Sequence, residues 1–289
     1  MSSLVRLESG HEFLLGPQRP LARPAYGARF DQFDTSGFDD CVPTVAPCLY
    51  PSGPKLPDHG ELWSAPAETE AGNGSLRFSL RGAALAYRFG KTIRCEQSEL
   101  ILDYEIANLA GAELHFLWSA HPLLRVEPGA RIRLPSEVRE LLVQYSLGDR
   151  LGAPGSTCGW PAAETRDGAA RLDLLLAPDA GFADKLFTPP LGAGYCSLEK
   201  PGAKERIEFE FDSASVPHLG LWICQGGWPD RTRGHYTVGL EPASARYDAL
   251  SEACACGEQS TLRAYETRRW RLKLKLSAYH GPIEEAEKV

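Results

Sequence analysis

Short runs in which apolar and polar residues alternate make up most of this chain of 289 residues, separated by Gly, Pro, Asn and Asp. A two-residue period puts neighbouring side chains on opposite faces of an extended backbone, so these runs predict β-strands. At least ten are predicted, at residues 75–82, 83–90, 99–108, 112–120, 140–146, 170–178, 205–213, 219–225, 235–242 and 268–279. Helical periodicity is limited to 182–187 and 247–255, where two short helices are predicted.

The last predicted strand shows how this pattern builds a core. One face carries Trp270, Leu272, Leu274 and Leu276, and the other carries Arg271, Lys273 and Lys275. So many strands would curl or split a single sheet, so we expect two large stacked antiparallel sheets, each burying one face. Because no compositional break marks a linker and no internal repeat is found, residues 1–289 are predicted as a single all-β domain.

Composition narrows the classes of partner. Apolar residues make up 43% and charged residues 24%, as in ordinary globular proteins. A net charge of −7 without a basic run argues against a nucleic-acid partner. The amino-terminal segment lacks the pattern of a secretory signal, and no apolar run is long enough to span a membrane. We therefore expect a cytoplasmic protein with no membrane partner, and the pattern leaves open whether it is a monomer or a homodimer.

The eight cysteines show neither CxxC pairs nor the regular spacing of a disulfide framework, so reduced thiols are expected. Cys254 and Cys256 lie together in "EACACGE". Two thiols without a nearby second pair of ligands are a poor zinc site, and no metal is predicted there.

Three segments carry the candidate chemistry: "PDHGELW" (57–63) with His59, "SAHPLLRVEPG" (119–129) with His121, and "GLEP" (239–242) with Glu241. Each titratable side chain lies at or near the end of a predicted strand, where a sandwich can present groups into a cleft. Taken singly, each has an ordinary alternative. Glu241 could be a solvated carboxylate, and His121 could simply end a strand before Pro122.

Together with "GFDDCVPTV" (37–45), "GLWICQGGWP" (220–229) and the final "WRLKLKL" (270–276), these segments resemble the aldose 1-epimerase (galactose mutarotase) superfamily in their order and spacing. The resemblance spans nearly the whole chain. It implies a β-supersandwich, a large two-layered antiparallel fold with a carbohydrate cleft. It also implies an isomerase that interconverts the α and β anomers of a monosaccharide.

The resemblance implies a role for each of the three side chains. Glu241 would take the proton of the anomeric hydroxyl, His121 would protonate the ring oxygen, and His59 would hydrogen-bond the sugar near that oxygen. A histidine with an ordinary pKa near 6.5 can donate and recover a proton around neutrality. A positioned acid or base typically supplies about 10²- to 10⁴-fold in rate, so two such groups would suffice without a metal or cofactor.

Five further residues are candidates for substrate binding. Asp39 and Asp40 could accept hydrogen bonds from sugar hydroxyls or stabilise a turn. Trp63 and Trp222 could offer flat apolar faces to a pyranose or lie in the core, and the same holds for Trp228. His235 precedes Glu241 by six residues, so an unbroken strand would put both on one face.

Two questions about cationic side chains remain open at this point: the role of one lysine and the identity of one arginine. Lys185, in "FADKLFTPP", is expected to be a solvated lysine, with contact to a hydroxyl or phosphate as the alternative. An arginine that contacts sugar hydroxyls in the superfamily could correspond to Arg29 or Arg94. This chain has His59-Gly60-Glu61 where familiar mutarotases carry a His-Gly-Gly-type turn, and Ser119-Ala120-His121 where they carry an Asn-rich segment.

Three other functions compete with the isomerase. A non-catalytic carbohydrate-binding protein would keep the cleft without proton transfer. A hexose-6-phosphate epimerase of the same superfamily would need a basic pocket, which the acidic charge balance disfavours. A lyase or hydrolase is conceivable on a similar sandwich, but a hydrolase needs two carboxylates flanking the bond, whereas two histidines and one carboxylate suit proton shuttling.

Overall fold

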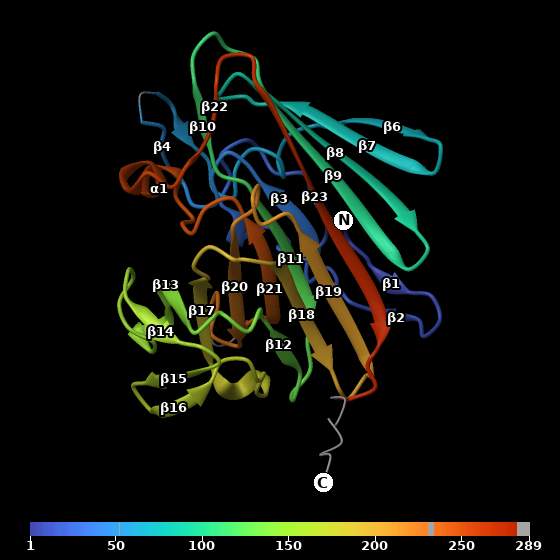
Figure 1. Ribbon diagram of the computed structural model, residues 1–289, viewed down its shortest axis with the longest axis vertical. Coiled ribbons are helices and arrows are strands. Elements are labelled where there is room, and N and C mark those ends of the chain that lie inside the picture. The colour runs from blue at the N-terminus through green and yellow to red at the C-terminus, as the bar shows by residue number, and fades with distance from the viewer. Residues whose placement is uncertain (52, 231–233, 282–289) are drawn as a thin grey trace.

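The computed structural model describes residues 1–51, 53–230 and 234–281 (Figure 1). Two large antiparallel sheets dominate this part of the chain, which confirms the predicted fold class. The seven-stranded sheet has the order β14 (Thr157–Gly159), β13 (Glu140–Ser146), β17 (Phe182–Phe187), β20 (His218–Gln225), β21 (Tyr236–Ala243), β11 (Ser119–Arg125), β3 (Phe38–Cys41). The eight-stranded sheet has the order β12 (Arg131–Arg133), β18 (Gly194–Lys200), β19 (Glu205–Phe211), β23 (Thr267–Ala278), β9 (Glu99–Asn108), β8 (Tyr87–Glu96), β7 (Ser75–Arg81), β6 (Glu68–Gly72).

Smaller elements close the ends of the sandwich. Four two-stranded pairs are formed by β1 (Val5–Arg6) with β2 (His11–Glu12), β4 (Cys48–Leu49) with β5 (Lys55–Leu56), β10 (Leu114–Phe116) with β22 (Ser260–Leu262), and β15 (Ala162–Thr165) with β16 (Gly168–Arg171). The α-helix is α1 (Leu250–Cys256), and single 3₁₀ turns lie at Phe30–Gln32, Leu147–Asp149 and Pro178–Ala180. Among the described residues, no helix has the length and apolar character that crossing a bilayer requires.

The predicted helix at 182–187 is wrong, because this segment is the strand β17. β17 lies between β13 and β20, and its residues from Ala183 to Phe187 are all buried. A strand buried on both faces loses the polar–apolar alternation that marks a half-exposed strand. The second predicted helix, at 247–255, is confirmed in α1 with shifted ends.

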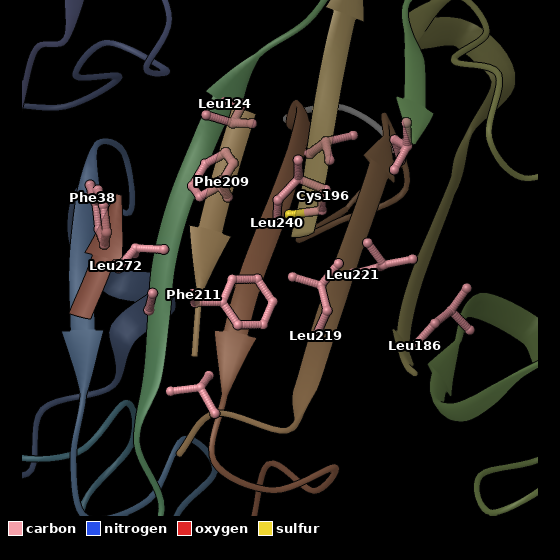
Figure 2. Packing of buried hydrophobic residues seen from close by; sticks show 14 of the residues in the cluster. Phe38, Leu124, Leu186, Cys196, Phe209, Phe211, Leu219, Leu221, Leu240 and Leu272 are labelled. Carbon is pink, nitrogen blue, oxygen red and sulfur yellow. The ribbon is translucent and has the colours of Figure 1, made fainter. Parts of the chain in front are cut away.

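The core lies between the two sheets. Leu219 and Leu221 of β20 and Leu240 of β21 belong to the same buried cluster as Phe209 and Phe211 of β19, from the facing sheet (Figure 2). Burying one such side chain contributes about 1.5–3 kcal/mol, so the alternating apolar faces hold the two layers together.

The alternation predicted for β23 is confirmed. Trp270, Leu272 and Leu274 are buried, whereas Arg271 is exposed and pairs with Asp103 of β9 at 2.6 Å. The eight-stranded sheet thus turns a charged face to the solvent. The outer face of the seven-stranded sheet is different, because loops and several titratable side chains cover it.

Candidate active site

Five neighbouring strands of the seven-stranded sheet each contribute a side chain to one wall: Tyr145 of β13, Lys185 of β17, Trp222 of β20, Glu241 of β21 and His121 of β11. Figure 1 shows these strands side by side. Lys185, Trp222, Glu241 and His121 alternate with core residues of their own strands, so their side chains point away from the eight-stranded sheet. The wall is therefore a consequence of the pairing register.

The register aligns the wall residues in two rows. Lys185 pairs with Tyr145 on one side and with Trp222 on the other. On β11, Ser119 pairs with Ala243 and Leu123 with Gly239, which places His121 opposite Glu241. Residues directly opposite in an antiparallel pair have neighbouring side chains, so His121 and Glu241 meet although they are far apart in sequence.

A β-bulge gives Tyr145 its orientation. Val143 pairs with Leu186 and Tyr145 pairs with Lys185, so Gln144 is an extra residue in β13. In a regular pairing without the bulge, the residue opposite Lys185 would be Gln144 and not Tyr145. Bulges commonly redirect a side chain next to a functional site, and here the bulge turns Tyr145 toward the wall.

The wall and the loop at residues 57–60 enclose a cavity of about 290 Å³. This volume is at the lower end of the roughly 300–1,000 Å³ typical of small-molecule sites. The cavity is lined by Phe30, Thr35, Val45, Ala46, Pro47, Asp58, His59, His121, Leu123, Tyr145, Lys185, Trp222, Trp228, His235, Glu241 and Asp248. All three residues predicted to be catalytic therefore face one cavity, together with Trp222 and His235.

Glu241 is fully buried at the floor of this cavity. Lys185 Nζ donates a hydrogen bond to its Oε2. The other oxygen, Oε1, accepts no hydrogen bond from the described residues, and His121 Nε2 lies 4.0 Å from it. A buried carboxylate oxygen without a donor is costly, so Oε1 is available to a ligand hydroxyl.

Two glycines make room for the Glu241 side chain. A Cβ added at Gly239 would lie 2.6 Å from Glu241 Oε1, and one added at Gly220 would lie 3.3 Å from Glu241 Oε2. Gly220 pairs directly with Glu241, and Gly239 precedes it by two residues on the same face. The "GLEP" and "GLWICQ" segments thus need glycine because the carboxylate occupies the space of a side chain.

His59 enters the cavity from the loop at residues 57–60. Its ring stacks on Phe30 with centroids 3.7 Å apart and meets the edge of the His121 ring at 5.1 Å. Its Nδ1 lies 2.8 Å from Asp58 Oδ1, which orients the ring. The backbone of His59 has φ of 55°, a left-handed conformation that non-glycine residues rarely adopt, and its N–H donates to Val45 O at 2.6 Å.

Glu61 explains the departure from a His-Gly-Gly turn. Its buried carboxylate accepts hydrogen bonds from the Ala84 N–H at 2.7 Å, the Tyr87 hydroxyl at 2.8 Å and the Tyr26 hydroxyl at 3.0 Å. These bonds tie the end of the 57–60 loop to Ala84, to the start of β8 and to Tyr26 of the amino-terminal region. In this chain the third position of the turn is a structural anchor outside the cavity.

Burial controls the protonation of the site. Burial lowers the pKa of His121 well below its ordinary value, and the nearby His59 and Lys185 lower it further. Burial raises the pKa of Glu241, and the ammonium group of Lys185 opposes that rise. Burial also acts to lower the pKa of Lys185, but Asp248 and Glu241 outweigh it and raise the pKa. Near neutral pH, His121 is therefore neutral and Lys185 carries a charge.

The remaining predicted binding residues do not line the cavity. Asp40 points into the core side of β3 and pairs with Lys91 at 2.6 Å. Asp39 pairs with His121 in the register and shares its face of the sheet, beside the cavity. Trp63 supports the loop, because its Nε1 donates to Asp58 O at 2.9 Å and its ring meets the edge of Phe30.

The prediction of a solvated Lys185 is wrong, because the side chain is 6% exposed and lies at the floor of the cavity. Neither arginine left open by the sequence lines the cavity. Arg29 pairs with Asp31 at 2.5 Å, and Arg94 lies on β8 and pairs with Asp103. Within the described residues, no three His, Cys, Asp or Glu side chains gather closely enough to hold a metal ion.

Comparisons with known proteins support the fold. No family model and no curated protein matches the sequence significantly. Solved structures do match, among them a galactose mutarotase related enzyme from Lactobacillus acidophilus, at 15% identity and a TM-score of 0.68, over 96% of this chain and 92% of the other.

Two further matches are galactose mutarotase-like proteins. The one from Lactobacillus casei is 16% identical with a TM-score of 0.64, covering 96% of this chain and 93% of its own. The one from Clostridium acetobutylicum is 10% identical with a TM-score of 0.61, covering 94% of this chain and 87% of its own. The five-strand wall, the cavity on its outer face and these matches agree: the chain has the fold of the galactose mutarotase-like proteins.

Proposed function

We propose that the protein is an isomerase that interconverts the α and β anomers of an aldose bound in the cavity. One observation carries the proposal: the buried Oε1 of Glu241 is left without a donor, 4.0 Å from His121, in a cavity of monosaccharide scale. The names of the structural matches, a galactose mutarotase related enzyme and galactose mutarotase-like proteins, point to the same chemistry.

Glu241 would act as the base. Its Oε1 takes the proton of the anomeric hydroxyl, the bond between C1 and the ring oxygen breaks, and the ring oxygen receives a proton. Rotation about the C1–C2 bond and reclosure give the other anomer. His121 and His59, which line the same cavity, would hydrogen-bond the sugar, and Trp222 and Trp228 would offer apolar faces to its C–H groups.

Polarimetry tests the proposal directly. Freshly dissolved α-D-galactose or α-D-glucose loses its excess rotation at a rate that the wild-type protein should increase. Glu241→Gln removes the base while keeping the shape, and should lower kcat by about 10²- to 10⁴-fold. Wild-type protein that leaves the buffer rate unchanged for every aldose tried would refute the isomerase.

The second candidate is a carbohydrate-binding protein without turnover. The ion pair between Lys185 and Glu241 favours it, because a paired carboxylate is a weaker base than a free one. Titration calorimetry with the same sugars separates the two: binding without any change in the mutarotation rate supports the second candidate. Glucose 6-phosphate should be included in both assays to test the hexose-6-phosphate alternative. Lys185 is already flanked by Glu241 and Asp248, so its charge is not free for a phosphate.

A further inference from the structure

Lys185 is a buried cation between two carboxylates. Its Nζ donates to Oε2 of Glu241 and lies 3.6 Å from Oδ1 of Asp248. Removing a charge from water costs several kcal/mol, and an apolar side chain could fill the same space without that cost. An ammonium group that lines a cavity and is buried beside the carboxylate of Glu241 is therefore a candidate for a chemical role.

We propose that Lys185 is the proton donor to the ring oxygen of the sugar, in the place that the resemblance gives to His121. This inference rests on the proposed isomerase function and adds to it a catalytic residue outside the His, His and Glu set.

The positions of the atoms favour Lys185. The anomeric oxygen and the ring oxygen are both bonded to C1, just as Oε1 and Oε2 are both bonded to Cδ of Glu241. A sugar whose anomeric hydroxyl donates to the free Oε1 can therefore place its ring oxygen beside Oε2, where the Lys185 ammonium stands. His121 approaches the carboxylate from the Oε1 side instead.

The protonation states point the same way. His121 is neutral near pH 7, and the N–H of a neutral imidazole is a very weak acid, whereas Lys185 is protonated and is held so by Glu241 and Asp248, which raise its pKa. Transfer of the anomeric proton to Glu241 removes a negative charge that holds the proton on Lys185, so the ammonium becomes more acidic during the reaction. The other groups that face Lys185 are Asp248, His121, Cys41 and Tyr145.

The step balances without a cofactor. The O1–H bond breaks and its proton goes to Oε1, while a C1=O1 double bond forms. The bond between C1 and the ring oxygen breaks and leaves its electron pair on that oxygen, which takes the proton from Nζ. Glu241 is then a neutral acid and Lys185 a neutral amine, and reclosure returns both protons.

Lys185→Arg is the decisive variant. Arginine keeps the charge and the ion pair but does not deprotonate in a protein, so it cannot donate a proton to the ring oxygen. We expect it to bind sugar as the wild type does and to lose about 10²- to 10⁴-fold in kcat. Lys185→Met should lose as much, and Lys185→Met with Glu241→Gln, which removes both charges, serves as the folding control.

Two outcomes would overturn the inference while leaving the isomerase intact. The first is a Lys185→Arg protein with nearly the wild-type kcat, which would make Lys185 an electrostatic partner of Glu241. The second is a wild-type kcat that already falls as the pH rises toward about 6.5, the range in which His121 loses its proton, together with a full loss of activity in His121→Asn, which would return the donor role to His121. A wild-type protein without turnover instead refutes the isomerase itself, and the donor role with it.

Discussion

Replacing Gly239 with alanine would put a methyl group into the space of the Glu241 carboxylate. The new Cβ would lie 2.6 Å from Oε1, 3.3 Å from Cγ of Glu241 and 3.2 Å from Cβ of Trp222. Ordinary contact begins near 3.4 Å, so Oε1 must move by about 0.8 Å, and a misplacement of about 1 Å can cost roughly 10²-fold in rate. Because the clashing atom ends a flexible side chain, we expect a loss of only about 1 kcal/mol in the free energy of unfolding.

The assay combines polarimetry with urea unfolding. Gly90→Ala on β8 is the matched control, because its new Cβ would meet no atom closer than 3.8 Å. Gly220→Ala should fall between the two, with new contacts of 3.1 Å to Phe187 and 3.3 Å to Glu241. Gly239→Ala protein that turns over sugar at the wild-type rate would refute the view that the glycine positions Oε1.

Three further predictions concern buried charges. Glu61→Ala should lower the free energy of unfolding in urea by about 1–3 kcal/mol for each donor it strands, the Tyr87 hydroxyl among them; an unchanged midpoint would contradict this. Asp40→Asn should cost about 3–5 kcal/mol by leaving Lys91 unpaired, and Asp40→Leu with Lys91→Met should recover most of it. Burial lowers the pKa of Lys200 to about 8, so the unfolded chain binds more protons between about pH 8 and 10 and stability should rise with pH there, a rise that Lys200→Met should abolish.

The half-exposed strands could be predicted from the sequence because their two faces meet different surroundings. β9 follows its predicted range of 99–108 without change, and β19 and β23 differ from theirs by one or two residues at an end. β20 and β21 are predicted as closely although they are buried on both faces. In two other segments the pattern misleads: 182–187, which is the strand β17, and 170–178. The run at 170–178 forms a strand only as far as Arg171, because Leu172 and Leu175 are buried from an irregular segment while Leu176 is exposed.

The site shows the same limit. The resemblance to the aldose 1-epimerase superfamily implies His59, His121 and Glu241 as joint candidates, and all three line one cavity. The prediction of a solvated Lys185 and the prediction of a helix at 182–187 fail for the same reason. A strand buried on both faces shows no polar–apolar alternation, so nothing in the sequence distinguishes its lysine from a solvated one. Tyr145 depends on a bulge, and Asp248 reaches Lys185 from a loop, and neither feature has a local sequence signal.

The five-strand wall also affects how such a protein could change over evolutionary time. Each wall side chain projects from a different strand. The backbone hydrogen bonds that pair these strands do not depend on which side chain stands at the wall position. A substitution at one wall position can therefore alter the chemistry of the cavity while the other four stay in place. Relatives with the same architecture could in this way diverge in the reactions they perform, one strand at a time, without rebuilding the sandwich beneath.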